Sequence, residues 1–236
     1  MFRWWLHLVF VYLAVVLPLT ARRRMQAFAA APVAAGGTPS QLRIYPRLIA
    51  AQWLLTGALV LTLWYVHVPL AALGLAAPPL VPLAECTAVL ALAWVVWDRK
   101  MRRTVREPAR RAKLLARFDR VRAFLPTSDL MMRWWIGVSI TAGVCEEVLY
   151  RGFFGYYLGQ WMPLWAAALV GSAVFGFAHV YQGWRGMLRT GVVGLLLWAT
   201  YLATGSLLQG MVLHALIDVR SGLALRRALA LEAAPA

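Results

Sequence analysis

The fold is decided by residues 134–157, which read WWIGVSITAGVCEEVLYRGFFGYY. The stretch exceeds the about 20 apolar residues that an α-helix needs to cross the hydrocarbon core of a membrane. It is mostly apolar but carries two adjacent glutamates and an arginine. Because lipid cannot satisfy backbone polar groups, such a segment has to be helical. The stretch therefore predicts a membrane-spanning helix with charge buried inside it.

The composition of the whole chain agrees with a membrane protein. Of its 236 residues, 62% are hydrophobic and 14% are charged, which excludes a typical soluble protein. Working outward from residues 134–157, further apolar stretches approach the spanning length. They predict an all-α, polytopic transmembrane helical bundle of about seven spans: Trp4–Thr20, Leu48–Val66, Leu80–Trp97, Trp134–Tyr157, Leu164–Val180, Thr190–Thr204 and Leu207–Leu223.

The net charge of +15 is distributed asymmetrically between these spans. Arginines cluster on one side if the N-terminus faces out and the C-terminus faces in, as the positive-inside rule requires. Only Arg3 lies on the other side. We therefore expect an integral protein of the inner (cytoplasmic) membrane of a bacterium, with the lipid bilayer and not nucleic acid as its partner. The clusters are Arg22–Arg24, Arg43, Arg47, Arg99–Arg122, Arg133, Arg185, Arg189, Arg220, Arg226 and Arg227.

Three parts follow along the chain. Residues 1–97 hold predicted spans one to three, residues 98–130 form a basic cytoplasmic loop, and residues 131–227 hold the last four spans. Apolar residues spaced among the arginines of residues 98–130 predict a basic helix that lies on the anionic inner membrane surface. Binding of nucleic acid by this basic segment is the alternative. The segment Ala29–Ser40, rich in Ala, Pro and Gly, predicts a flexible linker. A cleaved signal peptide is the alternative for the first span.

Ionisable residues inside spans are costly, at about 2.5–3.5 kcal/mol each on insertion scales, so they are usually paired and functional. All but one lie in the last four spans. They are Glu85, Glu146, Glu147, Arg151, His179, His214 and Asp218. Cys86 and Cys145 also lie in predicted spans, without metal-site or disulfide spacing, and are interpreted as small buried hydrophobes.

The two adjacent glutamates are expected to have different roles. Glu147 and Arg151 are four residues apart, so they share a helix face and can form an ion pair. Glu146 points about 100° away around the helix axis and is expected to be free inside the bundle, as a general base that takes a proton from water. A purely structural charge cluster explains Glu147 and Arg151 but not Glu146.

Two further pairs of residues, each spaced four apart, contain histidines. Phe175 and His179 share a face in predicted span five, and His214 and Asp218 share one in span seven. With Glu146, three helices then supply the residue types that activate water against a carbonyl or hold a divalent metal. Their convergence is an expectation.

Taken in order, Glu146-Glu147-x-x-x-Arg151, Phe175-x-x-x-His179 and His214-x-x-x-Asp218 resemble the three motifs of the CPBP family. These are the CAAX-protease and bacteriocin-processing intramembrane proteases, also called the Abi family. The resemblance covers roughly residues 130–225, and Tyr150-Arg151-Gly152 and Thr204-Gly205-Ser206-Leu207 are similar to the family too.

The resemblance implies a helical bundle with a membrane-embedded catalytic cavity and an intramembrane endopeptidase activity. By position, Glu146 and His179 would activate water and His214 and Asp218 would stabilise the oxyanion. Glu147, Arg151 and Phe175 would support the structure. Many family members carry Asn where this chain has Asp218, and an ionised Asp cannot donate a hydrogen bond to an oxyanion. The cofactor stays open: a divalent metal such as zinc, held by Glu146, His179 and His214, is one alternative.

The substrate that the resemblance implies is a membrane protein or a lipid-associated peptide, since the eukaryotic relatives cleave prenylated C-terminal tails. Two functions of other classes remain. One is a non-catalytic membrane scaffold or immunity factor that keeps the polar cluster for binding. The other is a proton-coupled transporter. The sequence shows no inverted repeat of the kind common in transporters, which argues against this function.

Overall fold

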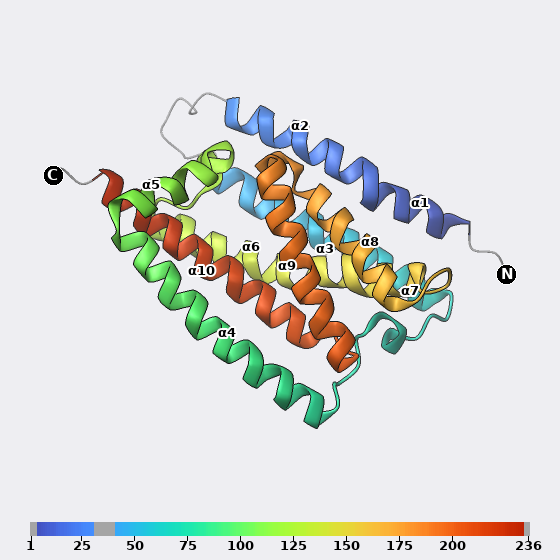
Figure 1. The fold of residues 1–236 in the computed structure, drawn as a ribbon. Coiled ribbons are helices and arrows are strands. Elements are labelled where there is room, and N and C mark those ends of the chain that lie inside the picture. Colours follow the sequence, from blue (N-terminus) through green and yellow to red (C-terminus); the bar gives the residue numbers. More distant parts are fainter. Residues whose placement is uncertain (1–3, 31–40, 234–236) are drawn as a thin grey trace.

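The computed structural model describes residues 4–30 and 41–233, and within these ranges the chain is helical with short connections and no strand (Figure 1). The all-α prediction is therefore confirmed. The elements are α1 (Trp5–Val11), η1 (Tyr12–Val16), α2 (Leu17–Ala30), α3 (Gln41–Tyr65), η2 (Leu70–Leu73), α4 (Leu80–Arg106), α5 (Pro108–Arg117), η3 (Asp119–Phe124), α6 (Asp129–Glu147), η4 (Val148–Phe153), α7 (Phe154–Leu158), α8 (Leu164–Ala178), η5 (Val180–Gln182), α9 (Trp184–Thr204) and α10 (Leu208–Ala233).

Four helical stretches among the described residues are long and apolar enough to cross a membrane: Trp5–Phe28, Leu42–Tyr65, Leu80–Arg106 and Trp184–Thr204. The chain is an integral membrane protein. The predicted number of seven spans is not confirmed by this criterion. Helix α8 has 15 residues and, at about 1.5 Å per residue, is shorter than the ~30 Å hydrocarbon core. Helix α9 begins at Trp184 rather than at the predicted Thr190.

Helix α6 lies at the centre of the bundle, between α3 and α10 (Figure 1). Helices α8 and α9 pack against each other, the continuous run from α1 to α2 passes along one edge, and α4 lies at the opposite edge beside α10. Small residues allow the closest approaches: a Cβ on Gly143 of α6 would lie 2.7 Å from the carbonyl oxygen of Met211 in α10. The helices that carry the polar residues are therefore held in direct backbone contact.

The basic segment differs from the prediction. Helix α4 continues to Arg106, so the start of the expected loop extends the third predicted span. The apolar residues Leu114 and Leu115 of α5 are buried in one cluster with Leu225 and Ala228 of α10. The expected lipid-facing side of this basic helix is thus covered by protein, because the C-terminal turns of α10 offer it an apolar partner.

The first two residues of the predicted linker are helical, and the rest is not described. Ala29 and Ala30 belong to α2, while residues 31–40 lie outside the described residues.

The turn between α9 and α10 is tied to the loop before α4. Gly205 adopts a left-handed conformation with φ of 66°, which glycine accepts without steric cost. Behind it, the Ser206 hydroxyl donates to the carbonyl of Ala76 at 2.7 Å and the Leu207 amide donates to that of Gly74 at 2.9 Å. The Thr204-Gly205-Ser206-Leu207 motif therefore has a structural role at one end of the bundle.

Candidate active site

The two glutamates end α6, immediately before the π-helical turns of η4. π-Helical turns are rare and frequently occur at functional sites. Within this bend, Arg151 Nη1 donates to Glu147 Oε1 at 2.9 Å, and the two side chains are 0% and 1% exposed. The predicted ion pair is confirmed, and it is completely removed from the surface of the bundle.

Glu147 has a second partner that the sequence did not predict. The Nδ1 atom of His214 lies 2.8 Å from the same Oε1 atom, so the imidazole N–H donates to this carboxylate. Asp218, four residues on along α10, is not hydrogen-bonded to His214. Asp218 Oδ2 lies 3.7 Å from His214 Nε2, beyond hydrogen-bond distance. Glu147 is the residue that fixes the orientation of His214, and it joins α6 to α10.

Arg151 is enclosed by α8 and α9. Its guanidinium lies 4.1 Å above the centre of the Phe175 ring, a cation–π contact that is stronger where water is excluded. Its Nη2 donates to the carbonyl of Gly194 at 3.4 Å. A Cβ on Gly194 would lie 3.2 Å from Phe175, so glycine leaves space for this arrangement. The supporting role predicted for Arg151 and Phe175 agrees with these contacts.

Glu146 has one occupied and one unoccupied carboxylate oxygen. Its Oε1 accepts a hydrogen bond from Gln52 Nε2 of α3 at 3.1 Å, so it is not wholly free as predicted. Its Oε2 is buried without a hydrogen-bond partner among the described residues and lies 3.9 Å from His214 Nε2. Sequence reasoning missed Gln52, although an amide inside an apolar span is a signal that could have identified it.

His179 follows the last residue of α8, and its Nδ1 lies 2.9 Å from the carbonyl of Phe175. Because a carbonyl only accepts, Nδ1 carries the proton and Nε2 has the lone pair in the neutral ring. Within the described chain no hydrogen bond joins His179 to Glu146, His214 or Asp218. The Phe175 ring contacts both histidines, with its centroid 4.9 Å from that of His179 and 5.9 Å from that of His214.

The structure thus brings Glu146, Glu147, Arg151, Phe175 and His214 together. Asp218 lies at the edge of this group, with 39% of its side chain exposed, and His179 is connected to it through Phe175.

The candidate metal ligands Glu146, His179 and His214 do not form a metal site. Over residues 4–30 and 41–233, no group of three or more His, Cys, Asp or Glu side chains is arranged to hold a metal ion. The bond from Nδ1 of His214 to Glu147 leaves only Nε2 of this ring as a possible metal ligand, and a zinc ligand set needs donor atoms that converge to about 2.0–2.3 Å from one point. The described residues are thus not arranged as a metal site, and the reaction proposed below is written with side chains alone.

Residues 128–220, about two fifths of the chain, match the family model of type II CAAX prenyl endopeptidase Rce1-like proteins. No curated protein and no solved structure matches the chain. The matched segment runs from the N-cap of α6 to the middle of α10 and contains every predicted site residue. The match confirms the resemblance to the CPBP family over this segment, which is similar to type II CAAX prenyl endopeptidase Rce1-like proteins.

Proposed function

We propose that the protein is an intramembrane endopeptidase that hydrolyses a peptide bond in a membrane-associated protein or peptide. The observation that carries this proposal is the difference between the two adjacent glutamates. Glu147 Oε1 is bonded to Arg151 and His214, whereas Glu146 Oε1 accepts only from the neutral amide of Gln52. Each carboxylate keeps one buried oxygen without a partner among the described residues, and that of Glu146 lies 3.9 Å from His214 Nε2. A buried carboxylate with a free oxygen beside a fixed imidazole fits a general base next to an oxyanion donor. The family match supports the reaction class.

In the proposed reaction, Glu146 takes a proton from water and the hydroxide attacks the scissile carbonyl carbon. Nε2 of His179, which has the lone pair, accepts a hydrogen bond from the same water. The tetrahedral oxyanion receives a hydrogen bond from Nε2–H of His214 in its protonated form, whose Nδ1–H remains on Glu147. Glu146 then gives its proton to the leaving nitrogen as the C–N bond breaks. The products are a carboxylic acid and an amine, and the side chains return to their starting state.

A groove between α4 and α9 suits an apolar substrate. It has a volume of about 340 Å³ and is lined by Pro82, Glu85, Cys86, Val89, Leu90, Leu196, Ala199, Thr200 and Ala203. Thr200 is buried beside Gly210, at which an added Cβ would lie 3.2 Å from the Thr200 hydroxyl and 3.1 Å from Glu147 Oε2. We propose this groove as the route from lipid to the catalytic group, and hence as the membrane-embedded cavity expected from the sequence.

The proposal includes the membrane arrangement. The seven predicted stretches all coincide with helical segments, and the arginine clusters favour a cytoplasmic location for α5 and the end of α10. We infer an inner membrane protein of a bacterium with seven spans, the fifth of them short.

The decisive experiment compares the membrane proteomes of cells that carry the wild-type protein or Glu146→Gln. A protease predicts that one or a few membrane proteins accumulate uncut in the variant and that their new termini disappear. Glu107→Gln is the matched control, because Glu107 is an exposed glutamate between α4 and α5 that lies outside both the polar cluster and the groove. A non-catalytic scaffold or a transporter predicts identical termini in all three strains, and that result would refute the proposal.

A further inference from the structure

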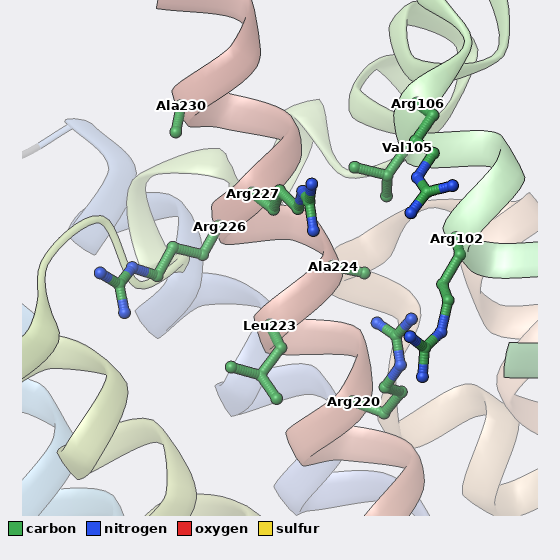
Figure 2. Close-up of a pocket in the computed structure, with 9 residues that line it drawn as sticks. All are labelled: Arg102, Val105, Arg106, Arg220, Leu223, Ala224, Arg226, Arg227 and Ala230. Atoms are coloured by element: carbon green, nitrogen blue, oxygen red, sulfur yellow. The ribbon is translucent and has the colours of Figure 1, made fainter.

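A second polar site lies between α4 and α10, among residues that the proposed reaction does not use. It is a pocket of about 520 Å³ lined by Arg102, Val105, Arg106, Arg220, Leu223, Ala224, Arg226, Arg227 and Ala230. Figure 2 shows the guanidinium groups of Arg102, Arg106, Arg220 and Arg227 directed into the space between the two helices. Arg226 points to the other side of α10 (Figure 2), where it pairs with Asp129 at 2.7 Å.

The charges in this pocket are not balanced. Asp98 accepts from Arg102 at 2.6 Å and from Arg220 at 2.5 Å, in both cases through the Nε atom of the arginine. The Nη groups of both arginines therefore remain available as donors. Arg106 and Arg227 have no ion pair with any described residue. Four converging cations against one carboxylate repel each other, and an anion relieves that repulsion.

Asp98 also organises the pocket in advance. A single carboxylate that holds one arginine from α4 and one from α10 fixes the spacing of the two helices at this level. Such preorganisation lowers the entropy lost when a ligand binds. The apolar side of the pocket, formed by Val105, Leu223 and Ala224, is suited to the carbon part of an amphiphilic ligand.

The position of the pocket in the membrane identifies the source of the anion. About two to three turns before Arg102, the first residue of the pocket, α4 exposes Leu92, Val95 and Val96, as expected for a lipid-facing helix. Trp94 lies within this stretch and Trp97 directly after it, with ring centroids 5.0 Å apart, and tryptophan is enriched at the level of the lipid headgroups. The pocket therefore begins where the hydrocarbon region ends.

We propose that this pocket binds the headgroup of an anionic phospholipid, with the phosphate among the four arginines and the acyl chains against the exposed face of α4. Arginine suits this ligand because its planar donor groups match phosphate oxygens in a bidentate manner. Basic pockets between helices on the cytoplasmic side are a known mode of lipid headgroup binding. The proposal does not depend on the protease function, since it uses none of the residues of the Glu146 cluster.

Binding of a short-chain phosphatidylglycerol, kept below its micelle concentration, to the purified full-length protein in an uncharged detergent tests this. Short-chain phosphatidylcholine and inorganic phosphate are the comparison ligands. We expect phosphatidylglycerol to bind about tenfold or more tightly than either. If inorganic phosphate bound as tightly as phosphatidylglycerol, the ligand of the pocket would be free phosphate rather than a lipid, and the proposal would be wrong. If phosphatidylcholine bound as tightly, the negative charge of the headgroup would have no role, which would also overturn the proposal.

The matched variants are Arg106→Gln/Arg227→Gln in the pocket and Arg103→Gln/Arg133→Gln outside it, each of which removes two charges. The first pair is expected to weaken phosphatidylglycerol binding about tenfold or more and the second less than about twofold, since only the first lines the pocket. Lysine at positions 106 and 227 should restore part of the affinity, which separates lost charge from lost folding. Wild-type affinity in the pocket variant, or an equal loss in the control pair, would overturn the proposal.

Discussion

Replacing Glu147 by Gln should destabilise the protein far more than the same change at Glu146. Glu147→Gln leaves Arg151 charged and buried without its carboxylate and takes the anionic acceptor from His214. Removing one partner of a buried ion pair costs about 3–5 kcal/mol. At about 2–4 °C per kcal/mol for a chain of this size, the expected fall in Tm is about 6–20 °C. Glu146→Gln keeps an oxygen that accepts from Gln52 and should cost under about 1 kcal/mol, because a hydrogen bond is retained.

Thermal unfolding of the purified variants in detergent, followed by tryptophan fluorescence, measures this difference. The activity is expected to follow a different order. Glu146→Gln should fold normally and lose about 10²–10⁴-fold of its turnover, the usual contribution of a general base. A Tm for Glu147→Gln within experimental error of that for Glu146→Gln would refute the assignment of the structural role to Glu147.

The double variant Glu147→Gln/Arg151→Met is the internal control. It removes both charges of the pair, and replacing a buried pair by groups of similar volume is often close to neutral. Its Tm should therefore lie above that of Glu147→Gln alone. A Tm below that of the single variant would mean that Arg151 stabilises the bundle mainly through its contacts with Phe175 and Gly194 rather than through its ion pair with Glu147.

Three further predictions follow. A reporter cysteine at Arg110 should react with an impermeant maleimide only after the cells are opened; labelling of intact cells would place α5 outside. Asp218→Asn should keep most of the activity and Asp218→Leu should lose it, because Asn keeps the size and hydrogen-bonding capacity of the side chain. If both variants lost their activity and also lost a metal that the wild type binds, Asp218 would instead be a metal ligand. Gly143→Ala should destabilise by about 1–3 kcal/mol through overpacking against α10. Gly57→Ala, in open space within α3, should stabilise by about 0.5–1 kcal/mol. Equal shifts in Tm for the Gly143 and Gly57 variants would contradict the close approach of α6 and α10.

The helices could be located from the sequence, but their ends could not. Hydropathy detects the part of a helix that suits lipid, and helices continue beyond it into charged residues. For this reason α4 extends to Arg106 and α10 to Ala233, past the predicted ends at Trp97 and Leu223. At the end of α4 the stop is local, since Pro108 favours the extended conformation of Glu107. Hydropathy records neither such a signal nor the packing partners of a helix.

The same limit applies to the site. The Glu147–Arg151 pair lies within one helix turn, so helical geometry alone predicted it. The bonds from His214 to Glu147 and from Gln52 to Glu146 join residues 67 and 94 positions apart. They depend on which helices are neighbours, and nothing in the local pattern around these residues specifies α3 and α10 as the neighbours of α6.

The arrangement of two hydrogen bonds on a single oxygen of Glu147 has a genetic consequence. Cells that carry a Glu147 variant are expected to lose the protein to quality control, so the allele should be recessive. A Glu146 variant keeps the folded bundle and its groove and should still occupy its substrate without cutting it. When expressed beside the wild-type gene, it should therefore act as a dominant-negative allele, and the retained substrate could be isolated with it.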